Sequence, residues 1–374
     1  MNSKILLIVL TLFSISTLGQ ISDFKQKFEL PSQVEETSGL LFFNSKIITH
    51  NDSGDTANLY EIDSLSGSLL RTININNATH IDWEDITEDE NHIYIGDFGN
   101  NDGERTDLKI YKILKSDYLN NNSVSAEIIS FSYEDQTDFS SSNTHNFDAE
   151  AFVVYNDSFF IFTKNRGDFK TNVYKIPTTI GNHSAVKVST ANVEGLITGV
   201  TLQNNNFMLC GYDTNAVPFL VYISFNRNTG DDIFNNGFSK YSLINELGVG
   251  SQVEGITRFD NGRFYISREE VNKSSINLKQ ALFEFKDDRD FLLSTDKNEL
   301  ESLRISPNPT FGKIFINNKN TIEKISIFNT LGKKILEINT DNKEIDISTF
   351  SKGIYLLKIQ FDNQKTINRK VIKL

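Results

Sequence analysis

Cysteine is almost absent from the sequence, since Cys210 is the single one among 374 residues. An intramolecular disulfide framework and a multi-cysteine zinc site are therefore excluded. Basic residues are also in deficit, with 37 Lys and Arg against 49 Asp and Glu, and the net charge of −12 argues against nucleic acid as a partner. A serine nucleophile elbow, an HExxH pair, a P-loop and a Rossmann glycine pattern are all missing. No common catalytic motif assigns a reaction to this chain.

Aromatic residues are abundant, with 29 Phe and 12 Tyr, and hydrophobic residues make up 38% of the chain. This composition can fill a core and favours β-strands. The length corresponds to about two domains of ~150 residues each. Residues 301–374 contain 13 basic and 7 acidic side chains, a net of +6, which leaves −18 for the remainder. We therefore expect an acidic body followed by a basic C-terminal unit.

The N-terminus has the pattern of a secretory signal peptide. Lys4 precedes the apolar run 5–18, and Thr17 and Gly19 are the small residues expected before a cleavage site. We predict a signal peptide over 1–19, with an N-terminal anchor as the alternative. No other stretch approaches the ~18 apolar residues of a membrane span, so we do not expect an integral membrane protein.

The C-terminal region 303–374 is a series of short apolar or alternating runs separated by turn residues. The runs cover 314–317, 325–329, 334–338 and 354–361, and Pro, Asn and Gly residues lie between them. This pattern predicts a small β-sandwich.

The amino-acid sequence of this region resembles the type A C-terminal sorting domain of the type IX (Por) secretion system of Bacteroidetes. The matching pieces are SPNPTFGKIFI, ISIFNTLGKKIL, IDISTFSKGIYLLKI and KVIKL, in that order. The resemblance implies that this domain engages the type IX machinery and that the protein passes through the periplasm and outer membrane to be secreted or attached at the cell surface. It also implies a domain over 303–374 and a linker over 293–302, so that function resides in residues 20–292.

The body contains a repeat. An acidic or polar residue, an apolar-alternating run, a polar turn and a second apolar run occur together five times, and two more strand-like runs follow most copies. Four strands in about 40–50 residues is the content of a propeller blade. We predict an all-β, five-bladed β-propeller, with six blades as the alternative. The fifth copy lacks a fourth strand, and the segment 23–30 is predicted to supply it and to close the sheet edge.

In a propeller, the first strand of each blade lines the central channel and the second strand returns to the same end. Polar residues at the start of the first strands and the end of the second strands should therefore meet at one mouth. The candidate ligand-binding or ion-binding residues are Glu36, Asp52, Glu84, Asp85, Asp97, Glu150, Lys164, Glu254 and Arg268. The candidate metal ligands among them are Glu84, Glu150 and Glu254.

Clustered carboxylates suit a hard cation such as calcium, which is the only cofactor we predict. The cationic side chains could instead hold an anionic group, or they could pair with the carboxylates and lock the blades together. We therefore expect a secreted propeller whose channel mouth binds a cation or an extracellular small ligand.

Short runs in the body, among them ETSGL, HNDSG, DWEDI and VEGIT, resemble poorly characterised secreted bacterial propellers and, loosely, phytase-like and SdiA-regulated propellers. Two alternative functions stay open, of which only the first is tied to this resemblance. One is a calcium-dependent phosphoesterase or esterase, so that an enzymatic role, if there is one, would be that of a hydrolase. The other is a surface adhesin or scaffold. The catalytic residues stay unassigned.

Overall fold

The computed structural model of the chain describes residues 21–203, 205–225, 230–273, 276–289, 304–317, 322–329, 333–338, 343–361 and 366–374. The predicted signal peptide and the predicted linker lie outside these residues. The chain forms two compact units that divide between Asp290 and Phe291. Within the described residues the regular structure is almost all strand, with two short α-helices, α1 (Lys115–Asn120) and α2 (Ile244–Leu247), and one 3-10 turn (Ser32–Val34). The all-β prediction is confirmed.

The first unit is built from antiparallel sheets, and each of the first two takes its strands in sequence order. In the first sheet the order is β2 (Thr37–Phe43), β3 (Lys46–Asn51), β4 (Asn58–Asp63) and β5 (Leu69–Ile75). In the second it is β6 (Trp83–Glu88), β7 (His92–Asp97), β8 (Lys109–Leu114) and β10 (Glu127–Tyr133). A short strand β9 (Ser123–Val124) leaves the second sheet and pairs in parallel with β5.

The third and fourth sheets repeat this order. The third contains β11 (Ala149–Tyr155), β12 (Ser158–Thr163), β13 (Thr171–Pro177) and β14 (Gly181–Ala191). The fourth contains β15 (Leu196–Gln203), β16 (Asn206–Tyr212), β17 (Pro218–Ser224) and β18 (Ser239–Ser242). The outer strand β14 also pairs in parallel with β10, so the second and third sheets are continuous along their outer strands.

The last sheet joins the two ends of the unit. Its strands are β19 (Val253–Asp260), β20 (Arg263–Arg268), β23 (Ala281–Asp287) and β1 (Ile21–Glu29), and β1 pairs antiparallel with β23 from Ile21 opposite Asp287 to Glu29 opposite Ala281. A small hairpin of β21 (Val271–Lys273) and β22 (Ile276–Leu278) is inserted between β20 and β23. The predicted pairing of the N-terminal segment with the fifth copy is confirmed.

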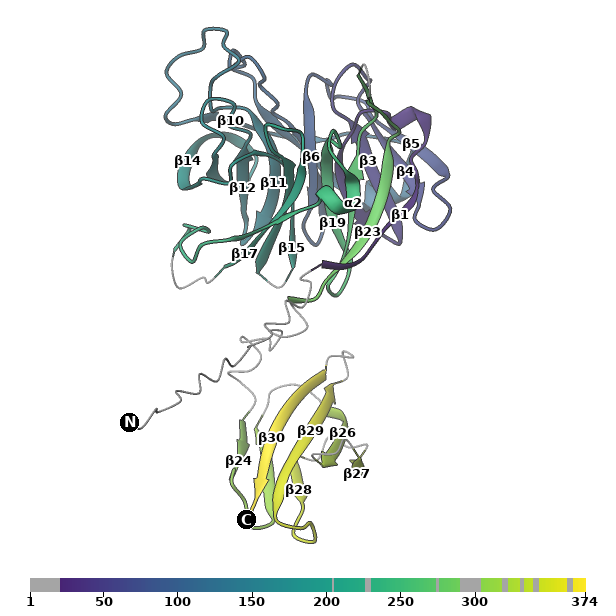
Figure 1. Ribbon diagram of the computed structural model, residues 1–374, viewed down its shortest axis with the longest axis vertical. Coiled ribbons are helices and arrows are strands. Elements are labelled where there is room, and N and C mark those ends of the chain that lie inside the picture. The colour runs from purple at the N-terminus through teal and green to yellow at the C-terminus, as the bar shows by residue number, and fades with distance from the viewer. Residues whose placement is uncertain are drawn as a thin grey trace, which may run out of the picture. The chain divides into compact units, whose positions relative to one another are not determined.

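The first strands of the five sheets follow one another in a closed circuit. Strand β2 contacts β6, β6 contacts β11, β11 contacts β15, β15 contacts β19, and β19 contacts β2 again. Several of these strands can be followed through the centre of the unit in Figure 1. We call these five strands the inner circuit. They are buried along most of their length because each one is flanked by two others.

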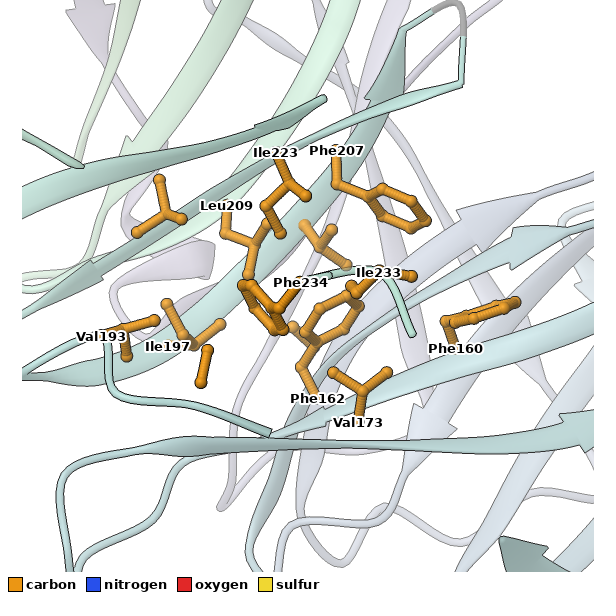
Figure 2. Packing of buried hydrophobic residues seen from close by; sticks show 14 of the residues in the cluster. Phe160, Phe162, Val173, Val193, Ile197, Phe207, Leu209, Ile223, Ile233 and Phe234 are labelled. Atoms are coloured by element: carbon orange, nitrogen blue, oxygen red, sulfur yellow. The ribbon is translucent and has the colours of Figure 1, made fainter. Parts of the chain in front are cut away.

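Neighbouring sheets pack through large apolar side chains. Between the third and fourth sheets, Phe160 and Phe162 of β12 lie against Phe207 of β16, with Ile197 and Leu209 in the same cluster (Figure 2). Aromatic residues bury ~150–250 Å² each, so they fill the wedge between sheets that diverge outwards. Many of the Phe residues of the sequence thus lie in the packing between neighbouring sheets.

In the described chain no backbone ladder joins the strands of the inner circuit to one another. Polar side chains provide hydrogen bonds between these strands instead. The central one is Asp85 of β6, which is fully buried. It accepts hydrogen bonds from the backbone N–H groups of Ile86 (2.8 Å) and of Phe152 on β11 (3.1 Å). The backbone of Val200 on β15 lies near it and, like these two N–H groups, acts against the rise in the pKa of Asp85 that burial causes. One carboxylate thus joins two strands of the circuit and faces a third.

The second unit consists of two sheets with a common core. One contains β24 (Arg304–Ser306), β25 (Lys313–Asn317) and β28 (Glu344–Asp346). The other contains β27 (Lys334–Ile338), β26 (Ile322–Asn329), β29 (Gly353–Phe361) and β30 (Thr366–Lys373). Buried Ile and Leu side chains from both sheets form one cluster, in which Ile314, Ile327 and Leu357 are fully buried. The four runs predicted in this region correspond to β25, β26, β27 and β29.

The closing strand generates a testable prediction. Deleting residues 21–30 should abolish cooperative thermal unfolding, because it exposes the edge of β23 and removes Phe24 from its contacts with Phe283 and Phe285. Calorimetry on this deletion should be compared with a chain that begins at residue 21. Equal melting temperatures and enthalpies in the two proteins would contradict the closing role of β1.

Candidate functional site

Each strand of the inner circuit begins with a β-bulge. The register shifts fall between Thr37 and Leu40, Trp83 and Ile86, Ala149 and Ala151, Ile197 and Gly199, and Val253 and Ile256. Bulges re-aim side chains at the ends of strands and are common beside functional sites. The first residues within these shifts are structurally equivalent, and we call them the bulge positions. They are Ser38, Glu84, Glu150, Thr198 and Glu254.

Glu36 lies two residues before the bulge position of its strand. Its backbone carbonyl accepts a hydrogen bond from the N–H of Asp52, and the carbonyls of Asp82 and Asp148 accept the equivalent bonds from Gly99 and Lys164. Glu36 is therefore equivalent to Asp82 and Asp148, whereas the sequence repeat aligned it with Glu84. The structure places Ser38 at this position, and the Glu36 side chain is exposed.

We call the end of the circuit at which these strands begin the mouth. A cavity of about 470 Å³ opens there. Four of the predicted residues, Asp52, Glu150, Lys164 and Glu254, line it. The other lining residues are Asn101, Arg166, Leu196, Tyr212, Asp213, Thr214, Ala216, Gln252, Glu269 and Lys273.

Two cations in the mouth are already engaged by carboxylates. Lys164 Nζ lies 2.9 Å from Glu150 Oε1, and Arg166 Nη2 lies 3.2 Å from Asp148 Oδ2. Burial acts to lower the pKa of Lys164, but the negative charges of Glu150 and Glu254 outweigh it and hold this pKa well above its usual value. Lys164 therefore stays charged and acts as a counter-ion within the protein.

Glu84 has no such counter-ion. Its residue is 3% exposed, and in the described chain no hydrogen bond or ion pair reaches its carboxylate. Burial raises the pKa of Glu84 well above its usual value, and the neighbouring carboxylates of Glu150, Asp52, Asp82 and Asp148 raise it further. There is space for this side chain because the adjacent residue is Gly99, where a Cβ would collide with the Glu84 carboxylate.

Glu84 belongs to two groups of carboxylates whose oxygen atoms lie within 4.8 Å of one another. The Asp52 triad consists of Asp52, Asp82 and Glu84, and the Asp148 triad consists of Glu84, Asp148 and Glu150. Either group could hold a metal ion, because hard divalent cations take several carboxylate oxygens as ligands. Sequence analysis named Glu84 and Glu150 among the metal ligands. The third candidate, Glu254, lines the cavity but lies in neither triad.

The remaining predicted residues have other contacts. Asp97 is fully buried and pairs with Arg105, with 2.9 Å between Oδ1 and Nη2. Arg268 donates to the backbone carbonyl of Lys279 through Nε (3.2 Å) and Nη2 (2.7 Å). Asp85 lies behind the bulge positions and bonds to backbone N–H groups, as described above. None of these three lines the cavity.

Several cavity residues were not among the predicted site residues. Tyr212 is the last residue of β16 and lies opposite Leu196. The expectation that polar residues at the end of each second strand lie at the mouth would have identified it. Asn101 comes from the loop after β7, and Lys273 comes from the β21–β22 hairpin, where it donates to Gln252 Oε1 at 3.0 Å. No repeat pattern marks these two, because they lie in loops that differ between the copies.

A histidine and the single tryptophan lie under the mouth. His50 and Trp83 are fully buried in edge-to-face contact, and Trp83 Nε1 donates to the carbonyl of Thr79 at 3.0 Å. The tryptophan is therefore part of the packing between the first two sheets. His50 Nδ1 lies 2.9 Å from the carbonyl of Asn51, while Nε2 is buried and has no hydrogen-bond partner among the residues that the structure describes. Burial lowers the pKa of His50 to about 4.

This histidine should make the fold acid-sensitive. Because its folded pKa lies below the value of 6.5 expected for the unfolded chain, its contribution to stability is present above pH 6.5 and is lost as the pH falls towards 4. The loss should approach about 3 kcal/mol. Urea unfolding of the parent and of His50→Gln between pH 7 and pH 4.5 measures this contribution as the difference between their pH slopes. Identical slopes would show that His50 is protonated normally in the folded state.

Comparison with known families identifies the C-terminal region. Residues 304–373 match the family described as the secretion system C-terminal sorting domain. The predicted type IX sorting domain is confirmed. The chain is therefore secreted or exported to the cell surface, and the sorting domain implies contact with the type IX machinery. No helix among the described residues has the length and apolar character needed to cross a membrane.

Individual known proteins give weaker matches. An ulvan lyase, NLR42 of Nonlabens ulvanivorans, is 32% identical over 84 residues, which is 21% of this chain and 16% of the lyase. The surface component PorZ of the Porphyromonas gingivalis type IX system superposes with a TM-score of 0.35 at 11% identity, over 90% of this chain and 45% of PorZ. An exo-β-1,3-galactanase of Phanerochaete chrysosporium gives a TM-score of 0.45 at 9% identity, over 94% of each chain. This chain thus spans less than half the length of the first two proteins.

The sorting domain makes export directly testable. A chain that ends at residue 303 should remain in the periplasm, because it lacks the matched residues 304–373. Cell fractionation and immunoblotting measure this distribution. As the positive control, a reporter that has a signal peptide and residues 304–374 should leave the periplasm. Export of the shortened chain at the parental level would contradict the sorting function.

Proposed function

We propose that the first unit is a five-bladed β-propeller whose mouth binds a divalent cation. The propeller is supported by five groups of four antiparallel strands, two of which are joined through β10 and β14 into one eight-stranded sheet. It is also supported by the closed circuit of their first strands and by the last group, which combines β1 from the N-terminus with β19, β20 and β23. In this last sheet β1 covers the outer edge of β23, as expected when a ring is closed by both ends of a chain.

The observation that carries the proposed function is that the buried Glu84 carboxylate has no cationic partner in the described chain. A carboxylate that is 3% exposed and has no cationic partner is unstable as an anion, especially beside further carboxylates. A cation in either triad removes this penalty. Lys164 and Arg166 do not remove it, because each is engaged by another carboxylate.

Calcium is the cation that the donor set favours. All donors in the two triads are carboxylate oxygens, which are the ligands that hard cations take, and the calcium ion accepts six to eight such ligands in flexible geometry. The absence of Cys or His from both triads argues against soft or borderline metals. The adjacent cavity leaves room for an extracellular ligand to supply further oxygen atoms to the ion.

A cation at the mouth should stabilise the fold. If calcium is present at ~100 times its Kd, binding adds about 2.7 kcal/mol, or roughly 5–10 °C in melting temperature. Calorimetry with calcium and with chelator should show this difference in the parent and not in Glu84→Gln. In chelator, Glu84→Gln should be at least as stable as the parent, because the substitution removes repulsion among the carboxylates.

The matched control is Glu36→Gln, which makes the same change at an exposed residue next to the mouth and outside both triads. This variant should respond to calcium like the parent. If chelator leaves the melting temperature of the parent unchanged, the mouth carboxylates are balanced by Lys164, by Arg166 and by protons, and the proposed function is wrong.

A further inference from the structure

We propose that the mouth holds two divalent cations, which share the Glu84 carboxylate. This inference rests on the proposed function, since it concerns the number of ions at the same site. The two triads have only Glu84 in common, and its two oxygen atoms allow it to bridge an ion in the Asp52 triad and an ion in the Asp148 triad. Bridging carboxylates are typical of two-metal sites, where the ions lie ~3.5–4 Å apart.

Two observations independent of the clustering point to a missing ligand at Glu84 and beside it. The first is Glu84 itself, which is buried beyond nine-tenths and has no partner in the described chain. The second is Asp52 Oδ1, a buried oxygen atom for which the described residues provide no hydrogen-bond partner. Buried polar atoms are nearly always satisfied in folded proteins, so the unpartnered Glu84, which both triads share, and the unpartnered Asp52 oxygen of the Asp52 triad indicate missing partners.

The balance of charge favours two ions over one. Among the described residues at the mouth, eight carboxylates and three cations give a formal net charge of −5. One divalent cation leaves −3 in a partly buried site, and two leave −1. The carboxylates are Asp52, Asp82, Glu84, Asp148, Glu150, Asp213, Glu254 and Glu269, and the cations are Lys164, Arg166 and Lys273.

Both positions are accessible from the cavity. Asp52 of the first triad and Glu150 of the second line its wall, so ions can enter on either side of Glu84. Each triad supplies three carboxylates, and the calcium ion takes six to eight ligands. The open coordination positions of the two ions would therefore face the cavity, where water or a ligand can fill them.

The two positions should differ in affinity. In the Asp148 triad, Asp148 is paired with Arg166 and Glu150 with Lys164, so their charges are partly neutralised before any metal ion binds. In the Asp52 triad, the described chain provides no ion pair to Asp52 or Asp82. The first ion should bind there, and the second should bind roughly tenfold more weakly or worse, because it also meets the charge of the first.

Calorimetric titration of the full chain with Ca²⁺ alone tests the stoichiometry. We expect two ions per chain for the parent and for Glu36→Gln, one for Asp82→Asn, and none of comparable affinity for Glu84→Gln. A parent that binds one ion, with Asp82→Asn binding none, overturns the two-ion arrangement and leaves the proposed function intact. A parent that binds no ion overturns both.

A second measurement needs no variant. Mn²⁺ added to the parent at two equivalents should give an electron paramagnetic resonance spectrum broadened by coupling between two ions that share a ligand. At half an equivalent, the six-line spectrum of an isolated ion should dominate. A spectrum that keeps the isolated form at two equivalents, with both ions bound, places the ions apart and contradicts the bridging role of Glu84.

Discussion

The five strands of the inner circuit must pack around one axis although no backbone ladder joins them to one another in the described chain. Asp85 meets this constraint in part by linking β6 to the N–H group of Phe152 on β11, and it also faces the backbone of Val200 on β15. The side chain needs space at the centre, and the residues in line with it on the other four strands are small: Gly39, Ala151, Gly199 and Gly255. At Gly199 and Gly255 a Cβ would collide with the backbone of a neighbouring strand, which shows how closely the circuit is packed.

The same close packing produces the chemistry of the mouth. Because every strand of the circuit begins with a bulge at the same level, side chains far apart in sequence meet there, and three of the five bulge positions are Glu. Residues that precede the bulges, Asp82 and Asp148, add further carboxylates. The cations paired with these carboxylates, Lys164 and Arg166, come from the segment directly after β12. The excess of negative charge at the mouth therefore arises because the fold brings equivalent positions together and most of these positions carry Asp or Glu.

Much of this arrangement was predictable from the sequence, because the repeat reflects strand order. The strand count of the fifth copy indicated that residues 23–30 complete the last sheet, and β1 does so. The alignment of Glu36 with Glu84 was offset by two residues, because bulges add residues where the copies begin and apolar periodicity does not record them. Asp52 was predicted at the mouth, but its closeness to Asp82 depends on how two sheets meet. The contribution of Lys273 depends on an inserted hairpin and has no sequence signal.

The central claim is that Glu84 requires a metal ion as its partner. Crystals of the protein grown or soaked with Mn²⁺ allow this claim to be tested by anomalous diffraction, which locates the ion without reference to its ligands. We predict anomalous peaks within coordination distance of the Glu84 carboxylate, in the space enclosed by the Asp52 and Asp148 triads. A map without a peak there, in which Glu84 instead accepts a hydrogen bond from Lys164 or shares a proton with another carboxylate, would contradict the account.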